Sequence, residues 1–148
     1  SDIATEIEIT QSSIIRNRRF SSLDMIISQD SSFELATKDE KHSWIKISFL
    51  KHDIIPKGYT IRSSNASTGG PHPKSWVIEG SMDSIDWDTL DIQNDCNFLN
   101  GRFLTHKFPI ENPANDNYKF LRMRQTDCNS RGLNVLCINY IEFFGTII

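Results

Sequence analysis

Apolar and polar residues alternate with a period of two along several short stretches of the chain. In Trp44–Phe49 the apolar Ile45, Ile47 and Phe49 are separated by a lysine and a serine. Such alternation places every second side chain on the same face of a β-strand. No stretch keeps the apolar period of about 3.6 residues that marks an amphipathic helix. The pattern predicts further strands at Glu6–Ile9, Tyr59–Arg62, Ser75–Glu79, Phe103–Phe108, Phe120–Arg124 and Leu136–Phe144.

The stretches between these strands are rich in Asn, Asp, Gly, Ser and Pro, which favour turns and loops. They are Ser63–Pro73, Asp91–Gly101, Ile110–Asn117 and Thr126–Asn134. About seven or eight short strands separated by such loops are typical of an antiparallel sandwich or jelly roll. The weak strand pattern between Arg16 and Ser43 predicts a long, loop-rich excursion near the start.

Composition agrees with this all-β fold class. The chain has 148 residues, the size of one domain, and contains 20 Ile but only 4 Ala. Its 16 basic and 19 acidic residues give a net charge of −3, which argues against non-specific binding to nucleic acid or to an anionic membrane. Its apolar runs are too short to span a bilayer, and residues 1–9 carry acidic side chains where a signal peptide needs basic and apolar ones.

The three cysteines, Cys96, Cys128 and Cys137, leave at least one thiol without a disulfide partner. An odd count is unusual for a small secreted domain, so we expect an intracellular, cytoplasmic protein. An extracellular location stays open as the alternative. Cys137 lies in an apolar strand and is expected to be a core residue, whereas the other two lie in polar stretches.

Motifs for catalysis and metal binding are missing from the sequence. The histidines His42, His52, His72 and His106 are too far apart to form a ligand pair at i,i+2 or i,i+4. There is no CxxC spacing, no Gly-x-Ser-x-Gly elbow and no glycine-rich phosphate loop. We therefore expect a protein that is not an enzyme and that holds no cofactor.

Three stretches together resemble the discoidin family, also called the coagulation-factor (F5/8) C-type domain, which has a galactose-binding-like jelly-roll fold. They cover nearly the whole chain, from Glu6 to Gly145. They are the tryptophan-led strand Trp44–Phe49, the hairpin Ser75–Asp83 followed by Trp87, and the closing strands Tyr118–Arg124 and Ile141–Gly145.

The resemblance implies a single eight-stranded discoidin-like domain over residues 1–148, excised from a larger protein. No cysteine lies near either end, where extracellular members often have a disulfide. The stretch Pro71–Trp76 (PHPKSW) is similar to that of the intracellular versions that follow BTB/POZ domains. Many members hold a structural calcium ion near the start. The matching stretch here, Ser28–Lys41, lacks the Asp-Gly-x pattern of the family, so we expect no metal, with structural calcium as the alternative.

In this family ligands meet loops at one end of the barrel, which correspond to Ser28–Lys41, Ser63–Lys74 and Thr126–Asn134. The residues that we expect to contact a ligand are His72, Lys74, Arg124, Asp127, Asn129, Arg131 and Asn134. For each of them the alternative is an ordinary solvated loop residue, and for Arg131 in particular the alternative is an ion pair with Asp127. The basic members of the group would suit an acidic peptide, a chain-terminal carboxylate or a uronic acid.

The expected function is that of a non-catalytic recognition module for a peptide or protein, such as substrate capture in a ubiquitin-ligase adaptor. The alternative is a carbohydrate-binding module. Sugar sites usually stack a pyranose on an exposed ring, and the only aromatic residue that the three loops offer is Phe33. The sequence therefore favours a peptide or protein partner, with no nucleic acid and no membrane.

Overall fold

The structure is a computed structural model that describes residues 7–13 and 34–148. These residues form ten strands. The strands are β1 (Ile7–Gln11), β2 (Leu35–Ala36), β3 (Trp44–Phe49), β4 (Ile54–Arg62), β5 (Trp76–Ser81), β6 (Asp88–Gln93), β7 (Thr105–Pro109), β8 (Phe120–Gln125), β9 (Cys137–Ile138) and β10 (Tyr140–Ile147). No helix capable of crossing a membrane occurs in this part of the chain.

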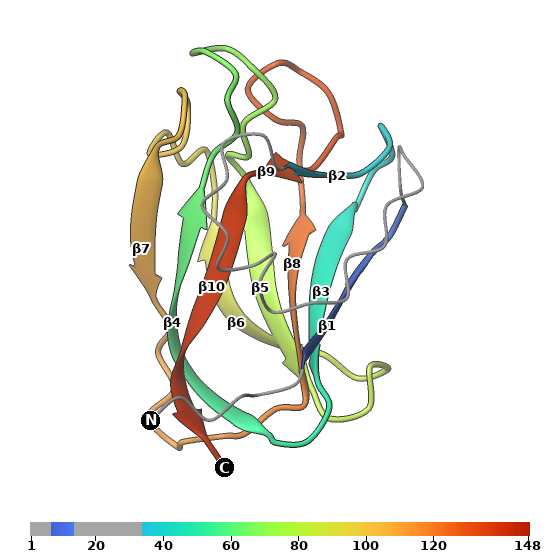
Figure 1. The fold of residues 1–148 in the computed structure, drawn as a ribbon, viewed down its shortest axis with the longest axis vertical. Helices are drawn as coiled ribbons and strands as arrows, with labels where there is room; N and C mark the ends of the chain where they lie inside the picture. The colour runs from blue at the N-terminus through green and yellow to red at the C-terminus, as the bar shows by residue number, and fades with distance from the viewer. Residues whose placement is uncertain (1–6, 14–33) are drawn as a thin grey trace.

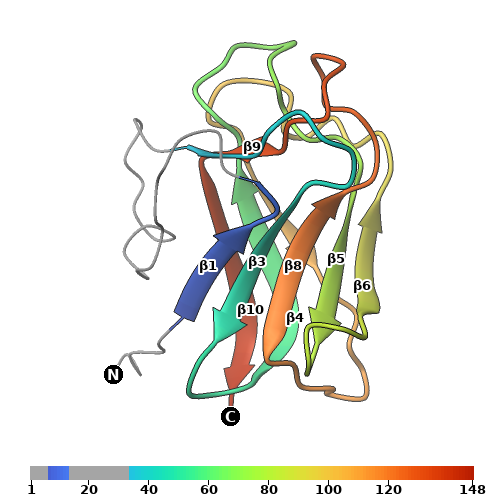
Figure 2. The same ribbon diagram turned by 90° about the vertical axis from the view of Figure 1, so that its right-hand side faces the viewer.

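Two antiparallel sheets face each other and make the two layers of a sandwich (Figures 1 and 2). One sheet has five strands in the order β1-β3-β8-β5-β6, and the other has three in the order β10-β4-β7. The short strands β2 and β9 pair with each other near one end. Ile47 of β3 lies between Ile9 of β1 and Leu121 of β8, so the apolar positions form rows across the sheet.

The core between the sheets is built around Trp76, which is completely buried. Its indole N–H donates a hydrogen bond of 3.0 Å to the hydroxyl of Tyr59 on the opposite sheet. That hydroxyl donates in turn to the carboxylate of Asp91 on β6. Burial and the bond to Asp91 raise the pKa of Tyr59. Phe108 stacks on Tyr59 at 4.9 Å between ring centres, so β4, β5, β6 and β7 are all joined at this point.

The all-β, antiparallel jelly-roll fold class is confirmed. Of the ten strands, eight have five to nine residues and two have only two residues. The expected single strand Leu136–Phe144 is divided into β9 and β10 at Asn139. The expected loop Asp91–Gly101 begins too early, because its first three residues pair with β5 as part of β6.

Because each of the three tryptophans sits at a predicted strand position, the sequence favours a core location for all three. This prediction is correct for Trp76 and wrong for Trp44 and Trp87, which are both half-buried. Trp44 points to the side of β3 opposite the buried Ile45. Trp87 lies over the guanidinium of Arg122, 3.9 Å from ring centre to Cζ, on the outer face of the five-stranded sheet. The β5–β6 hairpin folds back onto this outer face, which sequence alternation alone does not reveal.

None of the three cysteines, all of which lie in described segments, forms a disulfide. Cys96 and Cys137 are buried, whereas Cys128 is partly exposed. Burial raises the pKa of both buried thiols, that of Cys137 to about 12. The thiolate is the reactive form of cysteine, so burial and the raised pKa both slow reaction.

We expect Cys128 to react with dithionitrobenzoate at pH 8 at least tenfold faster than Cys96 or Cys137 in the folded protein. After denaturation without reductant, all three thiols should react. The rates can be assigned to individual residues by mass spectrometry of peptides in which the cysteine carries the thionitrobenzoate group as a mixed disulfide. Equal rates for Cys128 and Cys137, or a disulfide in freshly purified protein, would contradict this description of the thiols.

Candidate functional site

Four loops meet at the end of the sandwich where β2 and β9 lie, here called the loop end (Figure 1). They are residues 37–43, 63–75, 94–104 and 126–136. The segment after β8 is fixed to the segment before β5 by two backbone bonds. In these, Ser130 N–H donates to His72 O at 2.9 Å and Thr126 N–H donates to Ser75 O at 3.0 Å. Residues 94–104 join the same group because Cys96 N–H donates to Lys74 O at 2.7 Å. The two loops expected to carry the site, Ser63–Lys74 and Thr126–Asn134, therefore lie side by side.

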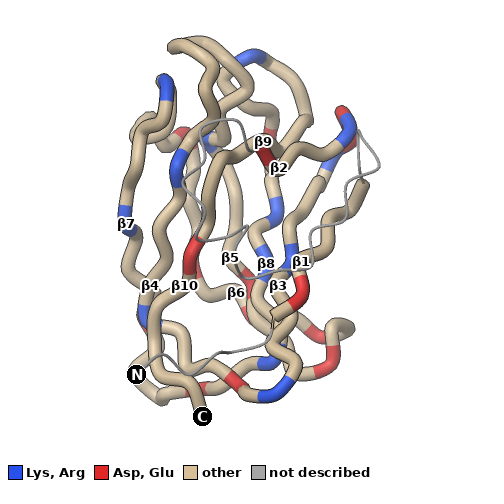
Figure 3. Tube along the Cα trace, in the orientation of Figure 1, with Lys and Arg blue, Asp and Glu red and all other residues tan. Residues whose placement is uncertain are grey.

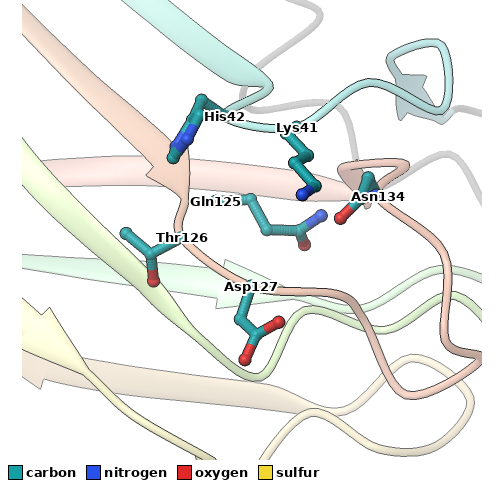
Figure 4. A pocket seen from close by; sticks show the side chains of 6 residues that line it. All are labelled: Lys41, His42, Gln125, Thr126, Asp127 and Asn134. Carbon is teal, nitrogen blue, oxygen red and sulfur yellow. The ribbon is translucent and has the colours of Figure 1, made fainter.

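A pocket of about 260 Å³ opens at this loop end between β3 and β8. We call it the loop-end pocket. Its lining residues are polar and come from three segments of the chain. The lining residues are Lys41, His42, Gln125, Thr126, Asp127 and Asn134. Figure 4 shows the Lys41 ammonium pointing toward Asn134 and the Gln125 amide, with the Asp127 carboxylate on the opposite side. The pocket thus has a cationic side and an anionic side.

The position of each wall is fixed by hydrogen bonds. The backbone N–H of Gln125 donates to Ser43 O at 2.8 Å, which holds the end of β8 beside the start of β3. The backbone N–H of Asn134 donates to a carboxylate oxygen of Asp39 at 2.7 Å, which holds the third segment against the first. The pocket is therefore largely pre-formed, and less conformational entropy is lost when a ligand binds.

Gln125 is the buried member of the lining, with only 2% of its surface exposed. Its Nε2 donates to Val135 O at 3.0 Å, but its buried Oε1 has no hydrogen-bond partner among the described residues. A buried acceptor left without a partner costs about 1–3 kcal/mol. A ligand N–H entering the pocket would supply the missing donor.

Two of the expected site residues, Asp127 and Asn134, line this pocket. Arg124 lies next to it, because its Nη1 is 3.4 Å from Nδ1 of the lining residue His42. The side chain of Arg124 itself lies on the outer sheet face, where it bonds to Glu79.

His72 and Asn129 are both almost fully buried and make hydrogen bonds within their own loops. The Nε2 of His72 lies 3.0 Å from both Ala66 O and Ser67 O, so it donates to that loop. Asn129 accepts from the backbone of Arg131 and donates to Val135 O. These two side chains hold the loops in shape, and neither of them lines the loop-end pocket.

Lys74 and Arg131 belong to loops at the correct end but do not line the pocket. Arg131 is exposed, and in the described structure it makes no ion pair with Asp127. Asp127 instead accepts a bond from the backbone N–H of Cys128. The expected alternative of an Arg131–Asp127 pair is thus not what the structure shows.

Sequence reasoning did not select Lys41, His42, Gln125 or Thr126 individually. Lys41 falls within the expected loop Ser28–Lys41. Residues 28–33 of that loop, including the aromatic candidate Phe33, lie outside the described residues. Leu35 of that loop is buried in the core. The signal that identifies Gln125 and Thr126 is their position just after the strand Phe120–Arg124, where side chains project toward the loop end.

An exposed aromatic ring was also missed, because it lies in residues 94–104, which were not among the three candidate loops. Phe98 is 52% exposed and stacks on His106 of β7, with 4.1 Å between ring centres. The loop end therefore does offer a ring on which a sugar can stack, and this bears on the carbohydrate alternative.

No group of three or more His, Cys, Asp or Glu side chains suitable for a metal ion is found within residues 7–13 and 34–148. Part of the stretch compared with the calcium loop of the family lies in the residues that are not described.

No protein-family model matches the chain. In sequence it is similar to the E3 ubiquitin-protein ligase Ufd4 of Drosophila melanogaster, with 30% identity over 133 residues. It is also similar to the E3 ubiquitin-protein ligase hecd-1 of Caenorhabditis elegans, with 23% identity over 126 residues. The matches cover 87% and 84% of this chain but only 5% of each ligase.

In structure the chain is similar to the C-terminal domain of a chitobiase from Bacteroides fragilis, with a TM-score of 0.71 and 14% sequence identity. The match covers 98% of this chain and 97% of the chitobiase domain. A second similar structure is the module CpGH89CBM32-5 of Clostridium perfringens, solved with GalNAc-β-1,3-galactose. Its TM-score is 0.69, with 11% identity and coverage of 94% and 95%. The chain therefore has the galactose-binding-like, discoidin-like jelly-roll fold of these modules.

Proposed function

We propose that this chain is a non-catalytic recognition module that binds a peptide segment of a protein partner in the loop-end pocket. The observation that carries the proposal is the buried, unpartnered Oε1 of Gln125 in the wall of a pre-formed polar pocket. A peptide offers the matching groups, since its N–H can donate to Gln125 and its carbonyl or carboxylate can accept from Lys41.

The biological setting that we propose is the capture of a protein by an intracellular ubiquitin ligase. The similarity to Ufd4 and hecd-1 supports it, because both are E3 ubiquitin-protein ligases and the match covers most of this chain. A ligase needs a surface that selects its substrate, and a rigid sandwich with a polar pocket is suited to that task. The three unpaired thiols are consistent with a reducing compartment.

Panning a library of random seven-residue peptides against the whole chain tests the proposal. We expect enriched peptides whose affinity falls at least tenfold in Lys41→Ala, because a hydrogen bond to a charged group contributes about 1.5–3 kcal/mol. The matched control is Lys38→Ala, an exposed lysine of the same segment outside the pocket lining, which should bind within twofold of the unchanged chain. No enrichment, or equal binding by both variants, would contradict the proposal.

A second candidate function, carbohydrate binding, is favoured by the exposed ring of Phe98 stacked on His106. Several similar structures are carbohydrate-binding modules, one of them solved with chitotriose. A glycan array tests this candidate, with Phe98→Ala as the diagnostic variant. Sugar binding that is lost in Phe98→Ala but kept in Lys41→Ala would replace the peptide proposal by the carbohydrate one.

A further inference from the structure

The outer face of the five-stranded sheet carries a group of aromatic and cationic side chains away from the loop-end pocket. Figure 2 has this sheet toward the viewer, with β1, β3, β8, β5 and β6 side by side. The buried residues of β3 and β8, such as Ile47 and Met123, point to the other face, into the core. The residues of this outer-face cluster, each half-buried, are Trp44, Lys46, Trp87, Phe120, Arg122 and Arg124.

Two of the three cations, Lys46 of β3 and Arg122 of β8, lie close to aromatic rings. The ammonium of Lys46 lies 5.6 Å from the centre of the Trp44 ring and 5.3 Å from that of Phe120. The Cζ atom of the Arg122 guanidinium lies 3.9 Å from the centre of the Trp87 ring. Cation–ring pairs of this kind are attractive and help to hold the charged groups in place.

Glu79 of β5 fixes the two arginines further. Its carboxylate accepts from Arg122 Nε and Arg124 Nε, both at 2.9 Å, and its side chain is only 8% exposed. Arg122 donates one N–H group to Glu79 and Lys46 one to Ser84, so most of their donors remain unused among the described residues. Arg124 uses more of its donors, two on Glu79 and one near Nδ1 of His42. The cations are therefore positioned in advance while still able to bind an anion.

The charge of this face opposes that of the whole chain. Three cations and one carboxylate give the centre of the face a net charge of +2, on a chain of net charge −3. Figure 3 shows the basic positions of β3 and β8 lying next to each other in the sheet. Acidic residues bound this centre, with Glu8 on the edge strand β1 and Asp86 in the β5–β6 hairpin.

From this arrangement we propose that the outer-face cluster is a second binding surface, which takes an acidic peptide segment containing aromatic residues. Carboxylates of the segment bond to Lys46, Arg122 and Arg124, and its rings pack on Trp44 and Phe120. The flat face of a sheet suits an extended segment rather than a compact group. This surface adjoins the loop-end pocket only where Arg124 meets His42, and it shares no residue with the pocket lining, so the two proposals can be tested independently.

A fluorescein-labelled peptide of sequence EDWEDFEDWE, added to the whole chain at low salt, tests the proposal by fluorescence anisotropy. We expect saturable binding that weakens at least tenfold in Lys46→Glu and also weakens as salt rises. The matched control is Lys107→Glu, which removes a cation placed 4.6 Å over the ring of Phe144 on the other sheet and should stay within threefold of the unchanged chain. Lys41→Ala should bind this peptide unchanged, which separates the surface from the pocket.

A second readout guards against a variant that simply misfolds. An unlabelled peptide of sequence EDFEDFEDFE, which adds no tryptophan fluorescence of its own, should shield Trp44 and Trp87 from iodide quenching in the unchanged chain, whereas the buried Trp76 is shielded throughout. Absence of binding, equal weakening by Lys107→Glu, or binding without protection from iodide would each overturn the proposal. Peptide-independent self-association that covers the same tryptophans would do so as well.

Discussion

Replacing Trp76 with alanine is expected to lower the free energy of unfolding by about 3–5 kcal/mol, the cost of truncating a large buried aromatic. Trp76 is completely buried between the sheets. The change also removes the donor to Tyr59 and leaves a cavity against Phe108, which meets the indole edge-on at 5.5 Å. Urea unfolding followed by circular dichroism measures the loss.

The control for this prediction is Trp87→Ala, the tryptophan that the sequence alone also placed in the core. Because Trp87 is half-buried and its main contact is with Arg122, its loss should cost only about 1 kcal/mol, near the value of an exposed cation–ring pair plus some lost packing. Similar losses for the two variants would contradict the positions of these rings.

Replacing Glu79 with alanine should cost about 3 kcal/mol, because two arginines that share its carboxylate would be left side by side on β8 without a partner. The figure lies at the lower end for buried ion pairs because Arg122 and Arg124 keep 18% and 26% of their side chains exposed. Glu79→Gln keeps the shape and some hydrogen bonding, and it should lose less. A loss below about 1 kcal/mol for Glu79→Ala would contradict a structural role for this group.

The same residue predicts a pH dependence. Burial on its own would raise the pKa of Glu79, but the hydrogen bonds from Arg124 and Arg122 and their charges outweigh burial and hold this pKa below its ordinary value of 4.5. A carboxyl group with a lowered pKa stabilises the fold above that ordinary value and loses the effect as the pH falls through the folded pKa. Between pH 5 and pH 3 the unchanged protein should therefore lose more stability than Glu79→Gln. Parallel curves for the two proteins would contradict this.

Much of the fold could be predicted because its signal is local. Alternation identifies β3 and β8 directly, since one face of each is apolar and the other is not. β6 is not among the strands predicted by alternation, because most of its positions are polar, and its last three residues were assigned to the loop Asp91–Gly101. The outer position of Trp87 was missed for a different reason: it depends on the way the hairpin folds back, which is a contact between distant parts of the chain.

The site was harder to predict than the fold. Loop connectivity points to the end of the sandwich where the loop-end pocket lies, and two of the residues selected in this way, Asp127 and Asn134, line that pocket. Sequence cannot tell an exposed loop residue from one that holds the loop together, however, and His72 and Asn129 proved to be of the second kind. The loop-end pocket also depends on Lys41 and Gln125, which meet only because β3 and β8 are neighbours.

The most direct test of the recognition proposal is a map of the backbone amide chemical shifts of the whole chain, titrated with a peptide enriched in the panning. The proposal predicts that the largest shifts occur at Lys41, Gln125, Asp127 and Asn134, with the amides of β7 and β10 nearly unchanged. Shifts centred on Phe98 and His106, or an absence of localised shifts at a saturating peptide concentration, would contradict recognition of peptides through the loop-end pocket.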